Sequence, residues 1–223
     1  YRLLERVTEP KLMAYGYGYL SHLAADTVAH NYYVPNMLGA APTSGKMSHV
    51  FIEMLADARV GWDRAEARRL FRASDTNADL LLLAAMRQRR WPFLLKKQLV
   101  ARGMKVYDYK SWEHSMNMAE RLLPFLDFHD YLERMFTLAL NAAAHCLNQP
   151  MDSPVLELDP IGSRNLKRVR KLRRDEGGRF PRHRIGSLFP EDDALCELPD
   201  CTMDAGGQAV TVRAARRRRT AAL

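Results

Sequence analysis

The sequence predicts an all-α protein built around a single multi-helix domain. Aliphatic residues and alanine dominate the hydrophobic 47% of the chain, and long stretches contain neither glycine nor proline, a composition that favours helices over strands. Apolar residues also recur at helical spacing, for example at Tyr131, Met135, Leu138 and Ala142. A chain of 223 residues is long enough for one domain with a sizeable core, and we expect no strand.

Proline marks both ends of the first predicted helix. We expect this helix over residues 9–34, with Pro10 in its first turn and Pro35 as its stop. A loop over residues 36–44 then separates it from a second helix over residues 46–60. This pair of helices carries the side chains that matter most below.

The rest of the helical domain is predicted from caps and apolar patterns. Asp75 is an expected N-cap, Gly103 an expected helix end, and Pro160 an expected helix start. The further helices before Pro160 are expected over residues 62–72, 75–90, 91–102, 108–123 and 126–148. We see no internal repeat.

The positive charge is concentrated near the C-terminus. Of the net charge of +8, residues 164–223 supply 15 Arg or Lys against 8 Asp or Glu, so the core is nearly neutral. This distribution argues against a basic nucleic-acid-binding face on the core. Because residues 178–223 are rich in proline, glycine and charge and lack periodicity, we expect them to be largely disordered. We therefore predict a helical domain over residues 1–175 and a basic low-order tail over residues 176–223.

Two of the predicted helices carry histidines and carboxylates on one face. In both helices the spacing is i, i+4, i+8, and because each step of four turns only ~40°, the three side chains share a face. These residues are His22, Asp26 and His30 on the first helix, and His49, Glu53 and Asp57 on the second. Imidazole and carboxylate are ligands that suit zinc where cysteine is absent. The alternative is that the histidines belong to the core and the carboxylates to a solvated face.

Residues 18–33 and 48–57 resemble the zinc-dependent phospholipase C family, and the helical pattern up to about residue 174 continues the resemblance more weakly. The family is all-helical, binds three zinc ions and is related to the single-strand-specific zinc nucleases. The resemblance implies a hydrolase of phosphodiester bonds that uses zinc-bound hydroxide as its nucleophile. It also implies a phospholipid or other phosphodiester substrate and a secreted or periplasmic location. The chain itself shows no signal peptide and no membrane span.

The resemblance also implies roles for five of the six residues. His22 and Asp26 would serve two paired zinc ions, with Asp26 as the bridging, catalytic carboxylate. His30, His49 and Glu53 would hold the third ion. The family's other ligands lie upstream of these motifs and are not found in residues 1–21, so we expect an N-terminally incomplete member that holds one or two zinc ions.

Two other hypotheses stay open from the sequence. One is a catalytically incomplete relative that keeps a structural zinc at His30, His49 and Glu53. The other is a helical interaction module without metal, whose arginine-rich tail contacts an anionic surface. Asp57 has no counterpart in the family, and we expect it beside the metal or in solvent.

Overall fold

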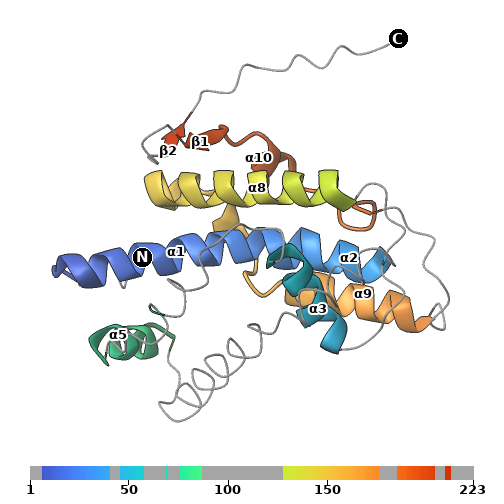
Figure 1. The fold of residues 1–223 in the computed structure, drawn as a ribbon, viewed down its shortest axis with the longest axis horizontal. Coiled ribbons are helices and arrows are strands. Elements are labelled where there is room, and N and C mark those ends of the chain that lie inside the picture. The colour runs from blue at the N-terminus through green and yellow to red at the C-terminus, as the bar shows by residue number, and fades with distance from the viewer. Residues whose placement is uncertain are drawn as a thin grey trace. The chain divides into compact units, whose positions relative to one another are not determined.

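The computed structural model describes residues 7–40, 46–57, 69, 76–86, 128–175, 185–203 and 209–211 (Figure 1). Helices dominate these residues and confirm the all-α class. The chain divides into one unit of residues 1–17 and 53–124 and another of residues 18–52 and 125–223. Two of the three division points, after residue 17 and after residue 52, fall inside helices that are themselves continuous. The helices expected over residues 91–102 and 108–123, and all of 62–72 except Arg69, lie outside the described residues.

Within the first unit, helix α5 spans Thr76–Met86 and lies inside the helix expected over residues 75–90. It buries Ala78 and Leu82 and leaves Leu80 exposed. The expected N-cap Asp75 lies outside the described residues. Among the described residues of the whole chain, no helix combines the length and the apolar character that a bilayer crossing requires.

The first helix continues past the proline that was expected to end it. Helix α1 spans Pro10–Val28, a π-helical segment η2 spans Ala29–Tyr33, and helix α2 spans Val34–Ala40, so the predicted stop at Pro35 and the start of the predicted loop are wrong. A proline in a helix removes one N–H and crowds the carbonyl four residues before it, and the wider π turn relieves that crowding. The carbonyl in question, that of Asn31, accepts a hydrogen bond from Asn165 Nδ2 at 2.9 Å instead.

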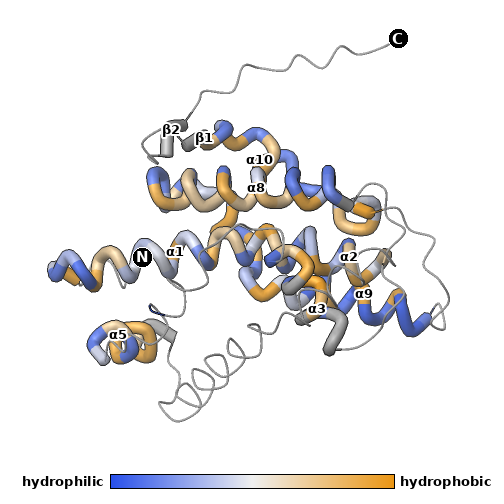
Figure 2. Tube along the Cα trace, in the orientation of Figure 1, coloured by the Kyte–Doolittle hydropathy of each residue, from blue (hydrophilic) through white to orange (hydrophobic). Residues whose placement is uncertain are grey.

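The segment from the π turn to the end of α2 forms the centre of the second unit. Every residue from 31 to 40 is buried, which is expected of a helix covered on all sides. This segment contacts α9, which spans Ser163–Asp175, and η2 also contacts α8, which spans Phe128–Asn148. The basic helix α9 is hydrophilic over much of its length (Figure 2), and it buries the apolar residues Leu166 and Val169.

Helix α8 confirms the apolar stripe that the sequence predicted. Its buried residues recur at intervals of three and four and are Tyr131, Leu132, Met135, Leu138, Asn141, Ala142 and Cys146. Two short 3-10 helices, η3 at Pro150–Asp152 and η4 at Pro154–Glu157, then lead toward α9. The helix that was expected to start at Pro160 begins at Ser163, after a tight turn.

The C-terminal segment is more ordered than the sequence suggested. Helix α10 spans Asp193–Cys196, and strands β1 (Cys201–Met203) and β2 (Ala209–Thr211) pair antiparallel, with Cys201 opposite Thr211. The expectation of no strand is therefore wrong, and the expectation of a low-order tail needs correction for residues 185–203. Phe189, Leu195 and Leu198 are buried there. The remaining tail residues, including the four arginines at 216–219, lie outside the described part of the chain.

Two buried asparagines hold this segment in place. Asn36 on α2 accepts from the backbone N–H of Phe189 at 3.0 Å and donates to its carbonyl at 2.8 Å, as a neighbouring strand would. Asn36 also donates to the Tyr131 hydroxyl at 2.9 Å. Asn141 on α8 accepts from the N–H of Cys201 at 2.8 Å. Because each of these anchors joins a single side chain to the backbone of a distant segment, they leave no periodic pattern in the sequence.

Candidate metal centre

Helix α3, which spans Lys46–Asp57, brings the second set of predicted ligands to the end of the first helix. Ile52 is buried on this helix, and its carbonyl accepts a hydrogen bond from the Tyr33 hydroxyl at 3.1 Å. Tyr33 closes the π segment that begins just before His30. His49 lies nearly one turn before Ile52, so this contact sets which face of α3 is turned toward His30.

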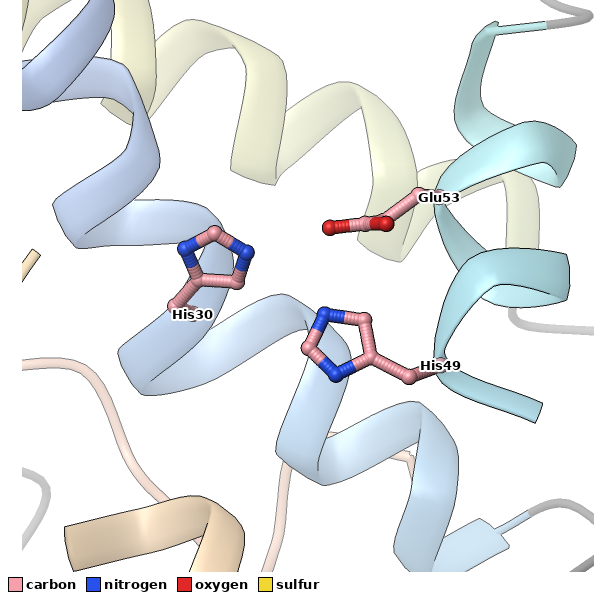
Figure 3. Close-up of side chains that lie close together, drawn as sticks. All are labelled: His30, His49 and Glu53. Carbon is pink, nitrogen blue, oxygen red and sulfur yellow. The ribbon is translucent and has the colours of Figure 1, made fainter. Parts of the chain in front are cut away.

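His30, His49 and Glu53 converge on one point. Their ligand atoms, one from each residue, all lie within 4.8 Å of one another, and all three side chains are partly buried. The two imidazole rings lie 5.4 Å apart between centroids, with their planes tilted by 52°. Figure 3 shows a ring nitrogen of each histidine and the carboxylate of Glu53 pointing into the same space. Glu53 lies one turn after His49 on the continuous α3 helix, so helix geometry fixes their relative positions.

The donor set and its spacing fit a zinc ion. Two imidazoles and one carboxylate, with a fourth position open, form a ligand set that occurs in catalytic zinc sites. Zinc bonds of ~2.0–2.2 Å would bring tetrahedral ligands to within about 3.4 Å of one another. The ligand atoms here are up to 4.8 Å apart, so small side-chain rotations would close the set around an ion.

One ring nitrogen of His30 is already engaged on the other side. Nδ1 lies 2.8 Å from the carbonyl oxygen of Pro160. A carbonyl can only accept, so Nδ1 carries the proton, and in the neutral imidazole Nε2 then keeps its lone pair. Nε2 is therefore the nitrogen available to a metal shared with His49 and Glu53.

His22 and Asp26 lie outside this cluster among the described residues. His22 Nε2 is 3.3 Å from Asp26 Oδ2, and the two side chains are 64% and 30% exposed. Asp26 also lies near Tyr19, where burial and the Asp26 charge raise the pKa of the Tyr19 hydroxyl. Asp57 is exposed at the end of α3 and is not part of the cluster either. Of the five predicted ligands, the structure thus brings together three and leaves the other two paired with each other.

The residues that support His30 on the side away from the cluster were not predicted from the sequence. Asn31 donates from Nδ2 to the carbonyl of Asp159 at 2.7 Å, and Pro160 accepts from His30. The signal available in the sequence was the stretch Asp159, Pro160, Ile161 and Gly162, whose residue types are typical of a tight turn. That signal predicts the turn, but nothing in it predicts that the turn contacts a segment about 130 residues earlier.

Comparison with known proteins supports the zinc interpretation. A family model described as zinc-dependent phospholipase C matches residues 2–146, which is more than half of the 223 residues. The matched stretch holds all five predicted ligands and ends within α8, so the turn at residues 159–162 and helix α9 follow it. Comparisons with curated proteins and with solved structures found no match.

Proposed function

Because this chain belongs to the zinc-dependent phospholipase C family, we propose that it hydrolyses phosphodiester bonds of phospholipids at a zinc centre held by His30, His49 and Glu53. The convergence of these three side chains from two helices carries the proposal. The three residues sit inside the stretch that the family model matches. Export to the periplasm or the medium is part of the same proposal and rests on the family alone.

Bound zinc supplies a Lewis acid that lowers the pKa of a water ligand toward ~7 and polarises a phosphoryl oxygen. The chain contributes the geometry for this chemistry. Glu53 would offset one of the two positive charges of a bound zinc ion, and the centre would then keep a net positive charge that attracts an anionic phosphodiester. The Pro160 carbonyl keeps the proton of His30 on Nδ1, away from the ion.

We propose that His22 and Asp26 serve the further zinc positions, with Asp26 as the bridging carboxylate. Support comes from their place one and two turns before His30 on the same continuous helix. Their exposure, 64% for His22 and 30% for Asp26, keeps both side chains within reach of substrate and of ligands from elsewhere. In this arrangement Asp26 sets the separation of the paired ions.

The test combines zinc content with hydrolysis of a defined substrate. Purified protein is loaded with zinc, and the release of phosphocholine from phosphatidylcholine vesicles is followed with and without a chelator. We expect at least about one zinc per chain and chelator-sensitive release, both strongly reduced by Glu53→Gln. Glu133→Gln, which changes an exposed carboxylate on α8, is the matched control and should leave both unchanged. Less than about one zinc per chain at neutral pH would overturn the proposal.

A second candidate is a relative that binds one structural zinc and has no hydrolase activity. The observation that favours it is the contact between His22 and Asp26, which pair with each other at 3.3 Å while the cluster forms without them. This candidate predicts bound zinc and a large loss of thermal stability on chelation. It predicts no release of phosphocholine and none of nucleotides from single-stranded DNA.

A further inference from the structure

The turn at residues 159–162 lies outside the stretch that the family model matches, yet it contacts the candidate zinc ligand directly. We propose that this turn is a positioning element, which fixes the ring orientation and the tautomer of His30 so that Nε2 faces the metal. The inference rests on the zinc centre proposed above and adds to it a part of the chain beyond the family match.

Three hydrogen bonds attach the turn and the start of α9 to consecutive residues of the π segment. His30 donates from Nδ1 to the Pro160 carbonyl at 2.8 Å. Asn31 donates from Nδ2 to the Asp159 carbonyl at 2.7 Å, and Asn165 donates from Nδ2 to the Asn31 carbonyl at 2.9 Å. Because both side chains and backbone take part, neither the ring nor the helix behind it can rotate without breaking one of these bonds.

Hydrogen bonds within the turn fix its conformation. The Asp159 carboxylate accepts from the N–H of Ile161 at 3.1 Å and from the N–H of Ser163 at 2.9 Å, and the Gly162 N–H donates to the Asp159 carbonyl at 2.9 Å. Pro160 fixes its own φ angle between these anchors. The Pro160 carbonyl therefore has a defined direction before any metal binds.

Gly162 makes the close approach possible. Its φ of +59° lies in the left-handed region, which favours glycine, and a side chain at this position would collide with the backbone carbonyl of His30. Any larger residue would therefore push the turn away from His30. The Pro160 carbonyl would then lose its contact with Nδ1.

Loss of that contact has a predictable effect on metal binding. A histidine whose second nitrogen has no fixed partner can rotate and can place its proton on Nε2, where it competes with the metal. Removal of such outer partners typically lowers metal affinity by about 10–100-fold. We expect a loss of this size when the turn is displaced.

The matched pair of variants is Gly162→Ala and Gly186→Ala. Both glycines have positive φ angles, +59° and +82°, so both substitutions strain the backbone, but Gly186 lies against Tyr131 and Arg134. Zinc affinity is measured by competition with a chromogenic chelator. Imidazole ¹⁵N shifts of the zinc-free protein report the tautomer. We expect Gly162→Ala to weaken zinc binding by about 10–100-fold and to shift the His30 proton from Nδ1 toward Nε2. Gly186→Ala should change zinc affinity by less than about threefold.

Asn165→Ala serves as a second variant in case Gly162→Ala does not fold. It removes only the hydrogen bond to the Asn31 carbonyl, and we expect zinc binding to weaken by about tenfold. The inference is overturned if folded variants of the turn bind zinc as tightly as the wild type and keep the Nδ1 proton. If the wild type binds no zinc, the proposed function fails, while the tautomer of the zinc-free protein still decides whether the turn orients His30.

Discussion

His22 and His30 lie on the same continuous helical stretch and carry the same imidazole group, but their surroundings in the folded protein differ. His22 is 64% exposed and contacts only Asp26 among the partners described above, at a distance of 3.3 Å. His30 lies in the π segment, faces His49 and Glu53, and is bonded to Pro160. Helical spacing therefore places metal-ligand side chains on one face of a helix, but it does not by itself form a metal centre. A metal centre forms where a second element meets that face and a third fixes the ring.

His22 and His30 also differ in how much side-chain conformational entropy each would lose when a metal binds. An exposed contact of this kind at i, i+4 contributes at most about 0.3–0.5 kcal/mol even when the histidine is charged, so the His22 side chain keeps most of its conformational freedom. His30 has lost that freedom in the folded protein, because its ring is hydrogen-bonded and partly buried. A ligand that is ordered in advance costs less entropy when the metal binds.

The largest expected effect separates the metal-ligand cluster from His22. His49→Ala removes a ligand from the cluster, and we expect the zinc affinity of that centre to fall by at least about a hundredfold, or ~2.7 kcal/mol. His22→Ala should change the same affinity by less than about threefold, because His22 lies outside the cluster. Isothermal titration with zinc measures both. Equal losses in the two variants would show that the cluster is not a separate centre.

An effect of similar size, on the stability of the fold and not on zinc affinity, is expected at the asparagine that anchors the C-terminal segment. Asn36→Ala leaves the buried N–H and carbonyl of Phe189 without their partner, so we expect the free energy of unfolding to fall by about 2–4 kcal/mol. Chemical denaturation measures this change. Zinc affinity of the folded variant should stay within about threefold of the wild type, which would separate the anchor of the fold from the anchor of His30. A fall in affinity as large as that of Gly162→Ala would remove this distinction.

The smallest effect is expected at the hydroxyl of Tyr131, which also contacts Asn36. Tyr131→Phe removes the hydrogen bond that the hydroxyl accepts from Asn36 and the one that it donates to the Tyr32 carbonyl at 3.2 Å. We expect a loss of about 1 kcal/mol in unfolding free energy at neutral pH. Burial raises the pKa of the Tyr131 hydroxyl well above its ordinary value. The unfolded chain therefore ionises this group near pH ~10 while the folded chain does not, so wild-type stability falls above that pH. The difference between variant and wild type should shrink there, and an increase would contradict the assignment.

The elements that the sequence predicted well are those with a regular period. The apolar stripe of α8 and the i, i+4 pair of His49 and Glu53 follow directly from helix geometry. The continuation past Pro35 could not be read from the sequence, because it depends on Asn165 replacing a missing backbone donor. Residues 185–203 were missed for the same reason, since the side chains of Asn36 and Asn141 hold them through hydrogen bonds to backbone groups far along the chain.

The candidate ligands of the site could be predicted from the sequence, but which of them cluster could not. Residue type and spacing identified His30, His49 and Glu53 as donors, and they equally identified His22 and Asp26. What distinguishes the two groups is tertiary packing, because α3 meets the helical stretch at His30 and not at His22 or Asp26. His30 is in addition hydrogen-bonded to Pro160, about 130 residues later in the chain. Such contacts depend on the tertiary fold and leave only a local turn signal in the sequence.

The most direct test is a structure of the zinc-loaded protein with anomalous data at the zinc edge. The account predicts a zinc peak bonded at about 2.0–2.2 Å to Nε2 of His30, a ring nitrogen of His49 and a carboxylate oxygen of Glu53. The Pro160 carbonyl should still accept from Nδ1 of His30. Zinc bound only at His22 and Asp26, or bound through Nδ1 of His30, would contradict it.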